Sequence, residues 1–293
     1  MELCSTLSDS CLDSLDTLGG KGLWKGAMSY FESSDGGRIY YEDHGSGAST
    51  MLLIHGWGMS VRCWDPILPS LSAADIRIVS IDHRGCGLSD KDFADMSIDA
   101  IAGDVATLVD KLGLSDVILN GWSLGGAVAV AAATKLGDRC SGLILTGGAS
   151  PIYTQKPDLA YGGTAEDVAG TLVAYETNRV DFLQGLSTIV CEKEVGANIE
   201  NWFYQIFLQA SPFAGATLGE LATLDQRQEL LALDIPIASI FGSADGFVAP
   251  DICRWVGDNH PRASNIEFEG VGHAPFIEAR DEYLSAVINF VQA

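Results

Sequence analysis

The chain has 293 residues, of which 47% are hydrophobic, and this composition is typical of a globular protein with a full hydrophobic core. Its 17 Lys and Arg residues stand against 39 Asp and Glu residues, which gives a formal net charge of −22. This charge argues against nucleic acid and anionic membrane surfaces as partners, because both are bound through basic patches.

The cysteines and the N-terminal residues indicate a cytoplasmic protein. Seven cysteines are scattered along the chain without a CxxC pair, so neither a disulfide framework nor a zinc site is expected. Residues 1–27 lack the basic start and the long apolar run of a secretory signal. No stretch approaches the length of a transmembrane helix. We therefore expect a cytoplasmic protein in which residues 1–27 form a flexible extension.

From residue 28 onward, short apolar runs alternate with helical patterns. Residues 30–45 predict a hairpin that turns at Asp35-Gly36-Gly37. Further strands are predicted at 51–56, 76–85, 117–123, 143–148, 237–246 and 264–270, and helices at 61–73, 97–112, 123–136 and 278–291. Most of these strands are continuously apolar, as in a sheet covered on both faces. The pattern predicts an α/β fold with a doubly wound, mostly parallel sheet and an active site at the carboxyl ends of its strands.

Residues 151–230 interrupt this alternation. They carry helical periodicity and many aromatic residues but no clear strand, and they are too long for an ordinary connection. We expect a helical cap over the strand ends, inserted into an α/β core of residues 28–150 and 231–293. The alternative is a set of ordinary helices packed on the flank of the sheet.

The motif Gly121-Trp122-Ser123-Leu124-Gly125 lies where a predicted buried strand meets a helix. A serine in this place occupies a sharp turn that exposes its hydroxyl at the top of the sheet. The N-terminus of the following helix favours negative charge nearby. The motif therefore predicts Ser123 as a catalytic nucleophile.

A serine hydroxyl needs a base to accept its proton at neutral pH. Among the five histidines, His273 lies in a glycine-flanked loop after the last predicted strand, where such a base is expected. His44 and His260 are expected to be ordinary surface residues. The loop motif thus predicts His273 as the general base.

An acid that orients this base should follow another strand. Asp245 comes directly after the apolar run at 237–246, and the chain order Ser, Asp, His is the one expected of this kind of sheet. The rivals Asp225, Asp234 and Asp251 precede the strand or begin the next helix. The alternative for Asp245 is a structural role in a turn.

Two strand-end motifs suggest how negative charge would be stabilised. His55-Gly56-Trp57-Gly58 closes the first long strand, and we expect His55 to brace this loop. The backbone N–H groups of Trp57 and Leu124 are the expected oxyanion hole. Residues 82–89 are interpreted as a structural turn. The expected acyl pocket consists of five aromatic residues: Trp57, Trp122, Trp202, Phe203 and Phe207. No metal or organic cofactor is needed for this chemistry.

The motifs HGWG, DHRGCGLSD, GWSLGG, FGSADGFV and GHAPF occur in the order found in the α/β-hydrolase superfamily, which the chain resembles over residues 28–293. Within it, HGWG, GWSLGG, DGFVAP and HAPFI are most similar to the pimeloyl-[acyl-carrier protein] methyl ester esterases of biotin synthesis. In that family the matching serine, aspartate and histidine form a catalytic triad, and the amides matching Trp57 and Leu124 form the oxyanion hole. The resemblance implies hydrolysis of a methyl ester, with broader activity on short acyl esters.

Two features depart from this family. Its cap grips the acidic carrier protein with basic residues, whereas residues 151–230 contain four basic residues against eleven acidic ones. Like charges would slow and weaken docking of a carrier protein. The DHRGCGLSD loop is more similar to general esterases and cofactor-free haloperoxidases. A broad short-chain esterase or thioesterase, a haloperoxidase-like perhydrolase and a hydrolase-like small-molecule receptor therefore stay open as alternatives.

Overall fold

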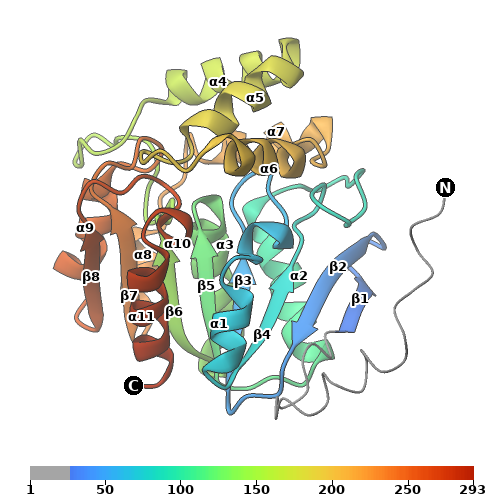
Figure 1. Ribbon diagram of the computed structural model, residues 1–293, viewed down its shortest axis with the longest axis vertical. Helices are drawn as coiled ribbons and strands as arrows, with labels where there is room; N and C mark the ends of the chain where they lie inside the picture. The colour runs from blue at the N-terminus through green and yellow to red at the C-terminus, as the bar shows by residue number, and fades with distance from the viewer. Residues whose placement is uncertain (1–26) are drawn as a thin grey trace, which may run out of the picture.

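The computed structural model describes residues 27–293, whose strands join into one mixed sheet of eight strands (Figure 1). The spatial order is β1-β2-β4-β3-β5-β6-β7-β8. The strands are β1 Ala27–Glu32, β2 Arg38–His44, β3 Ser49–Ile54, β4 Ile76–Ile81, β5 Val117–Trp122, β6 Cys140–Thr146, β7 Ile237–Gly242 and β8 Ala263–Phe268. The β1–β2 and β2–β4 pairs are antiparallel and the pairs from β4 to β8 are parallel. The predicted fold class is confirmed. The predicted extension lies, apart from Ala27, outside the described residues.

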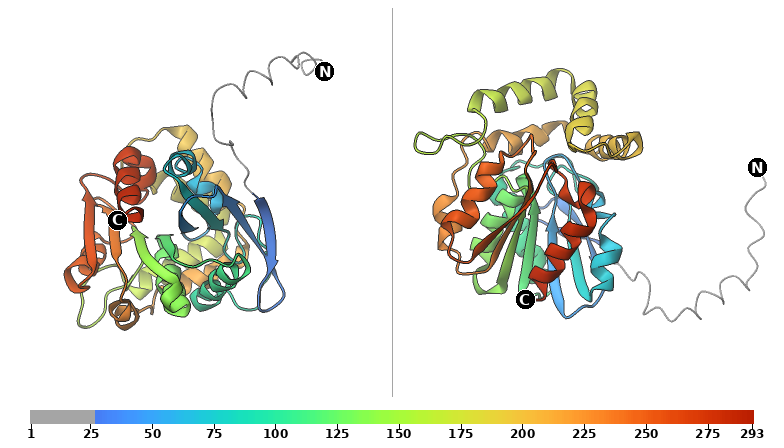
Figure 2. Two further views of the ribbon diagram at one scale, coloured as in Figure 1. Left: turned by 90° about the horizontal axis from the view of Figure 1, so that it is seen from below. Right: turned by 60° about the vertical axis from the view of Figure 1, so that its left-hand side comes forward.

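Helices cover both faces of the sheet, as Figure 2 shows. On β3, Leu52 and Ile54 belong to the core on one face, while Met51 and Leu53 belong to the core on the other. Because successive side chains of a strand point to opposite faces, both faces of this strand must be apolar. One core includes residues of α2 Ile98–Lys111, α3 Leu124–Leu136 and α9 Pro250–Asn259, and the other includes residues of α1 Leu68–Ala73 and α11 Arg280–Val291.

Local signals explain where these helices begin and end. The Ser97 hydroxyl caps α2 by accepting the N–H of Ala100 at 3.1 Å, and Lys111 lies in its last turn. The predicted helix 61–73 is instead a short 3₁₀ helix, Val61–Trp64, followed by α1. Pro66 lies between them, and proline removes a backbone donor and clashes with a preceding helical turn.

We call residues 151–230 the helical insert. Its helices are α4 Ala165–Thr177, α5 Arg179–Ile189, α6 Ala197–Phe207 and α7 Gly215–Glu220. Figure 1 shows these helices lying across one end of the sheet rather than along a face. The predicted boundary at residue 230 falls inside α8 Arg227–Ala232, so the insert leads into β7 through a helix that belongs to both segments.

The strand register gathers four loops at one edge of the sheet. Ile54 pairs with Gly121, so the loops that follow β3 and β5 start side by side. Gly242 pairs with Phe268, which does the same for the loops that follow β7 and β8. These loops carry the residues that the sequence predicts for catalysis. Beyond the loop after β8, the chain forms the short helix α10 Pro275–Glu278 before α11.

Candidate active site

Ser123 lies on a sharp turn between β5 and α3. Its backbone has φ 56° and ψ −124°, a left-handed conformation that costs a non-glycine residue about 1–3 kcal/mol. The neighbouring glycines make the turn possible: a Cβ on Gly121 would lie 2.1 Å from the carbonyl oxygen of Gly125, and one on Gly125 would lie 2.3 Å from that of Ile54. The N–H of Ser123 donates to Thr146 at 3.1 Å, which ties the turn to β6.

His55 holds the peptide group that carries the predicted oxyanion donor of Trp57. Its Nε2 accepts the N–H of His83 at 2.9 Å, so its proton is on Nδ1, which donates to the carbonyl oxygen of Gly56 at 2.7 Å. Burial lowers the pKa of His55 to about 4, which keeps the ring neutral. Because the C=O and N–H of a trans peptide point in opposite directions, the N–H of Trp57 is directed away from the ring.

Trp57 and Leu124 line the same cavity as Ser123. Leu124 is the first residue of α3, where an N–H has no partner within the helix. Among the hydrogen bonds of residues 27–293, none uses the backbone N–H of either residue. The indole of Trp57 donates to the carbonyl oxygen of Ala214 at 2.8 Å, which fastens this loop to the helical insert.

Asp245 and His273 form a buried pair. The Nδ1 of His273 lies 2.8 Å from Oδ2 of Asp245, whose side chain is fully buried. The other carboxylate oxygen accepts the N–H groups of Phe247 at 2.8 Å and Val248 at 3.0 Å. These bonds fix the carboxylate, and the ring of Phe247 stacks on the imidazole with centroids 4.8 Å apart. The imidazole can therefore tilt very little.

The backbone of the His273 loop is held from two directions. The indole of Trp122 donates to the carbonyl oxygen of His273 at 2.8 Å. The N–H of His273 donates to the carbonyl oxygen of Val190, in the helical insert, at 3.1 Å. The loop that carries the predicted base is thus attached both to the residue before Ser123 and to the insert.

Glu278, which the sequence analysis did not select, holds the same loop. Its Oε2 accepts the N–H of Gly272 at 2.9 Å, and its Oε1 accepts that of Ala274 at 3.3 Å. Oε2 also accepts the N–H groups of Glu192 and Lys193, both at 2.9 Å. One carboxylate therefore binds the residues on both sides of His273 and joins them to the helical insert. The sequence does hold one indication of this role, because Glu278 is a carboxylate only five residues after the predicted base.

Ser123 and His273 line one cavity of about 250 Å³. Of the five residues expected in the acyl pocket, Trp57, Trp122 and Phe207 lie on its wall. The wall also includes residues that the sequence analysis did not select: Met59, Tyr153, Thr171, Phe182, Leu186, Ile189, Val190, Leu218, Leu221 and Phe247. Most of its lining is apolar, so the cavity suits an apolar acyl group.

Trp202 and Phe203 do not line this cavity, contrary to expectation. Phe203 is fully buried behind its wall, with its ring 6.4 Å from that of Trp122. Trp202 is partly buried and packs on Phe203 at 5.1 Å. Phe207, one turn further along α6, reaches the cavity instead. The aromatic residues of a helix point in different directions, and composition alone does not show which of them faces a ligand.

The other histidines that the sequence analysis considered, and the rival aspartates, make contacts outside the candidate active site. His260 is buried, not exposed as expected, and its Nε2 lies 2.8 Å from the carbonyl oxygen of Leu233. His44 is mostly buried beside Glu42, at 2.9 Å. Each of the three rival aspartates is paired with an arginine, namely Asp225 with Arg227, Asp234 with Arg262 and Asp251 with Arg254. Among residues 27–293, no group of three or more His, Cys, Asp or Glu side chains is placed to hold a metal ion.

Comparison with known proteins identifies the family. Residues 49–280 match the family model described as alpha/beta hydrolase fold. The chain belongs to the alpha/beta hydrolase family. The predicted superfamily is therefore confirmed.

Relatives of this alpha/beta hydrolase include esterases. A protein of Nitrosomonas europaea named pimeloyl-[acyl-carrier protein] methyl ester esterase is 30% identical over 256 residues, which cover 84% of this chain and 97% of that protein. The AB hydrolase superfamily protein YisY of Bacillus subtilis is 27% identical over 263 residues, or 89% of this chain and 98% of that one. The solved structure of the esterase EaEST from Exiguobacterium antarcticum superposes with a TM-score of 0.88 at 25% identity, covering 91% of this hydrolase and all of that chain.

These relatives support the prediction that this alpha/beta hydrolase is a serine esterase. The resemblance to the pimeloyl-[acyl-carrier protein] methyl ester esterases is also confirmed as a sequence relationship. None of the helices in the described part of the hydrolase has the length and apolar character needed to span a membrane.

Proposed function

We propose that the chain hydrolyses carboxylic esters through a triad of Ser123, His273 and Asp245. The observation that carries this proposal is the buried Asp245–His273 pair, 2.8 Å apart, whose histidine lies on the wall of the cavity that Ser123 also lines. The cavity combines a nucleophile, a base oriented by an acid, and two backbone N–H groups on its wall. This set of parts is the one that acyl transfer requires.

In the proposed mechanism the Oγ of Ser123 bonds to the ester carbonyl carbon while Nε2 of His273 accepts its proton. The carbonyl oxygen becomes an oxyanion, which accepts hydrogen bonds from the N–H groups of Trp57 and Leu124. When the C–O bond to the alcohol breaks, Nε2 returns the proton to the leaving oxygen. Water then attacks the acyl-enzyme by the same route and releases the acid. Asp245 stabilises the imidazolium form of His273 in both stages.

The helical insert serves in this proposal as a cap that closes the acyl cavity. Its residues Phe182, Leu186, Val190 and Phe207 form much of the apolar wall. Without them, the loops at the strand ends would be open to water, which weakens the hydrogen bonds of an oxyanion hole.

The experiment is steady-state hydrolysis of p-nitrophenyl esters from acetate to decanoate by the wild type and Ser123→Ala. We expect an optimum at butyrate or hexanoate, because the cavity is small, and a loss of at least about a thousandfold in kcat for the variant. Ser285→Ala, on the exposed side of α11, is the matched control. Full activity in Ser123→Ala would contradict the triad. A folded wild type inactive on every ester would favour the small-molecule receptor.

A narrower substrate within this proposal is the methyl ester of a pimeloyl-carrier conjugate, which the names of several relatives suggest. The protein would then work in the cytoplasm, as the sequence predicts. A comparison of dimethyl pimelate with methyl pimeloyl-carrier protein tests it. A carrier-bound ester with the higher kcat/KM supports this substrate. Equal or slower hydrolysis supports the broad esterase, since the acidic insert offers few basic residues to a carrier. Thioesters and peroxide are assayed alongside, because the same triad would serve them.

A further inference from the structure

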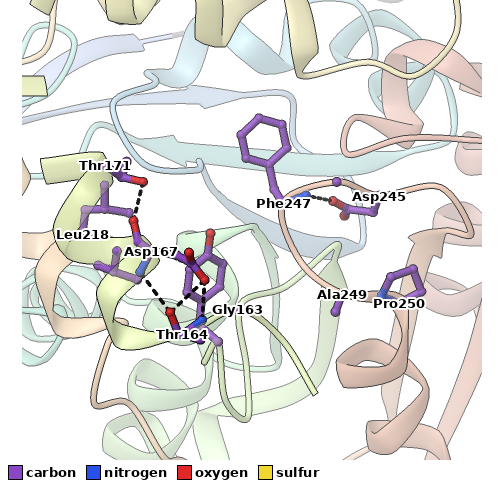
Figure 3. Close-up of a pocket in the computed structure, with 12 residues that line it drawn as sticks. Gly163, Thr164, Asp167, Thr171, Leu218, Asp245, Phe247, Ala249 and Pro250 are labelled. Carbon is purple, nitrogen blue, oxygen red and sulfur yellow. Dashed lines mark hydrogen bonds between the residues drawn. The ribbon is translucent and has the colours of Figure 1, made fainter. Parts of the chain in front are cut away.

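A second cavity, of about 430 Å³, adjoins the cavity of Ser123. The two share four wall residues, namely Tyr153, Thr171, Leu218 and Phe247. Figure 3 shows Thr164, Asp167 and Thr171 on one side of the second cavity and Asp245, Phe247 and Pro250 across from them. We call it the polar cavity, since its wall includes the carboxylate of Asp167 and the hydroxyl-bearing residues Tyr153, Thr164 and Thr171.

Negative charge dominates the polar cavity. Asp167 accepts the N–H of Thr164 at 2.7 Å and its hydroxyl at 2.9 Å, both on Oδ2, and these bonds hold the pKa of its carboxyl below the ordinary value. The other oxygen, Oδ1, accepts no hydrogen bond from a described residue. Burial and the charges of Asp245 and Asp167 raise the pKa of the Tyr153 hydroxyl. No Lys or Arg is among the described residues that line either cavity.

The polar cavity lies on the acid–base side of the site. We call the cavity of Ser123 the apolar cavity. Asp245, which pairs with His273, belongs to the wall of the polar cavity, and Phe247, which stacks on the imidazole, belongs to the walls of both cavities. The predicted oxyanion donors Trp57 and Leu124 line the apolar cavity and not the polar cavity, and so do Ser123 and His273. In an acyl transfer the leaving oxygen must face the histidine that protonates it, while the carbonyl oxygen faces the oxyanion donors.

We propose that the polar cavity binds the alcohol half of the ester and selects alcohols that carry a hydroxyl or ammonium group over those that carry an anion. This proposal depends on the esterase function proposed above. The apolar cavity takes the acyl half. A hydroxyl group donates a hydrogen bond to Asp167, and an ammonium group is attracted by the negative charge of Asp167. A carboxylate, sulfonate or phosphate is repelled, because no Lys or Arg on the described wall offsets the negative charge of Asp167.

The first test compares butyrate esters that differ in the charge of the alcohol: choline, its uncharged isostere neohexyl alcohol, and isethionate, which bears a sulfonate. We expect kcat/KM to fall in that order, with at least about tenfold between the choline and isethionate esters at low salt. The kcat/KM for glycerol monobutyrate should likewise exceed the kcat/KM for propyl butyrate. Equal kcat/KM for all alcohols would overturn the proposal, whatever the variants do. If p-nitrophenyl butyrate is not hydrolysed either, the esterase function itself fails.

The second test assigns the preference to Asp167. Asp167→Asn keeps the size of the side chain and its acceptor for Thr164 but removes the charge. We expect the ratio of kcat/KM for choline butyrate to kcat/KM for neohexyl butyrate to fall about threefold to tenfold. Asp181→Asn is the matched control, because Asp181 is an exposed residue in the first turn of α5 and lines neither cavity. An equal change in both variants would show a general effect of net charge and overturn the proposal.

Discussion

The serine half and the acid–base half of the candidate site are held in different ways. At the ends of β3 and β5, the turn of Ser123 is fixed by backbone packed on backbone, with no room for a Cβ at Gly121 or Gly125. At the ends of β7 and β8, Gly242 packs as closely on the backbone of Val271, but the loop of His273 is also fixed by side chains that come from elsewhere, among them Trp122 and Glu278. The first half tolerates almost no change of shape, whereas the second depends in addition on individual side-chain hydrogen bonds that can be removed one at a time.

The largest effect should come from adding a methyl group to the serine half. In Gly125→Ala the new Cβ would lie 2.3 Å from the carbonyl oxygen of Ile54 and 2.6 Å from that of His55, and backbone cannot yield as a side chain does. We expect a loss of about 3 kcal/mol or more in the free energy of unfolding and almost complete loss of ester hydrolysis. Thermal denaturation and the p-nitrophenyl butyrate assay measure the two.

Gly103→Ala, within α2, is the control for this change. A Cβ at Gly103 meets nothing within 4 Å, so the substitution should stabilise the protein by about 0.5–1 kcal/mol through helix propensity. If Gly125→Ala behaved like Gly103→Ala, the backbone packing of the serine half would not be the rigid element described above.

A second prediction concerns pH and the same half. The pKa of His55 is lowered to about 4 in the native state, so between pH 6.5 and 4 the unfolded chain binds a proton that the native protein does not. The contribution of neutral His55 to the free energy of unfolding is therefore fully present above pH 6.5. It is lost as the pH falls toward 4, by about 3 kcal/mol in total. We expect the wild type to lose more stability than His55→Gln over this range.

Urea denaturation of both proteins at several pH values measures this difference. The carboxyl of Asp82, whose pKa burial raises to about 6, acts with the opposite sign, since its contribution is lost as the pH rises. It is present in both proteins and cancels in the comparison. A stability difference that stays constant from pH 7 to pH 4 would contradict the neutral, buried imidazole.

The smallest effect should come from removing one anchor of the acid–base half. Glu278→Gln removes the charge and replaces one of two acceptor oxygens by an NH₂ group, so the side chain can no longer accept N–H groups at both positions. We expect kcat to fall about tenfold to a hundredfold, with little change in KM or melting temperature, because the base is misplaced while the apolar cavity is kept. The pH–rate profile should broaden or shift on its acidic side.

Glu282→Gln, at an exposed position on α11, is the matched control and should retain wild-type kinetics. A Glu278→Gln variant with normal kcat would show that the histidine loop keeps its place without this carboxylate. A variant that loses stability and activity in equal measure would assign Glu278 a merely structural role.

This contrast also explains what could be predicted from the sequence. The sheet and the turn of Ser123 are encoded by neighbouring residues, such as the apolar run of β5 and the glycines at 121 and 125. Glu278 was missed because its partners at 192 and 193 lie more than eighty positions away. Trp202 and Phe203 were assigned to the pocket because composition does not give the orientation of a helix, and His260 was misjudged because its partner is Leu233.

The bond between Val190 and His273 has a consequence for building chimeric enzymes from this chain. Grafting another helical segment in place of residues 151–230 would discard the carbonyl of Val190 and the amides of Glu192 and Lys193. Glu278 would keep the N–H groups of Gly272 and Ala274 but lose both donors that the insert supplies. The insert is therefore not an exchangeable module on its own, and a working graft must supply an acceptor for the N–H of His273 and donors for Glu278.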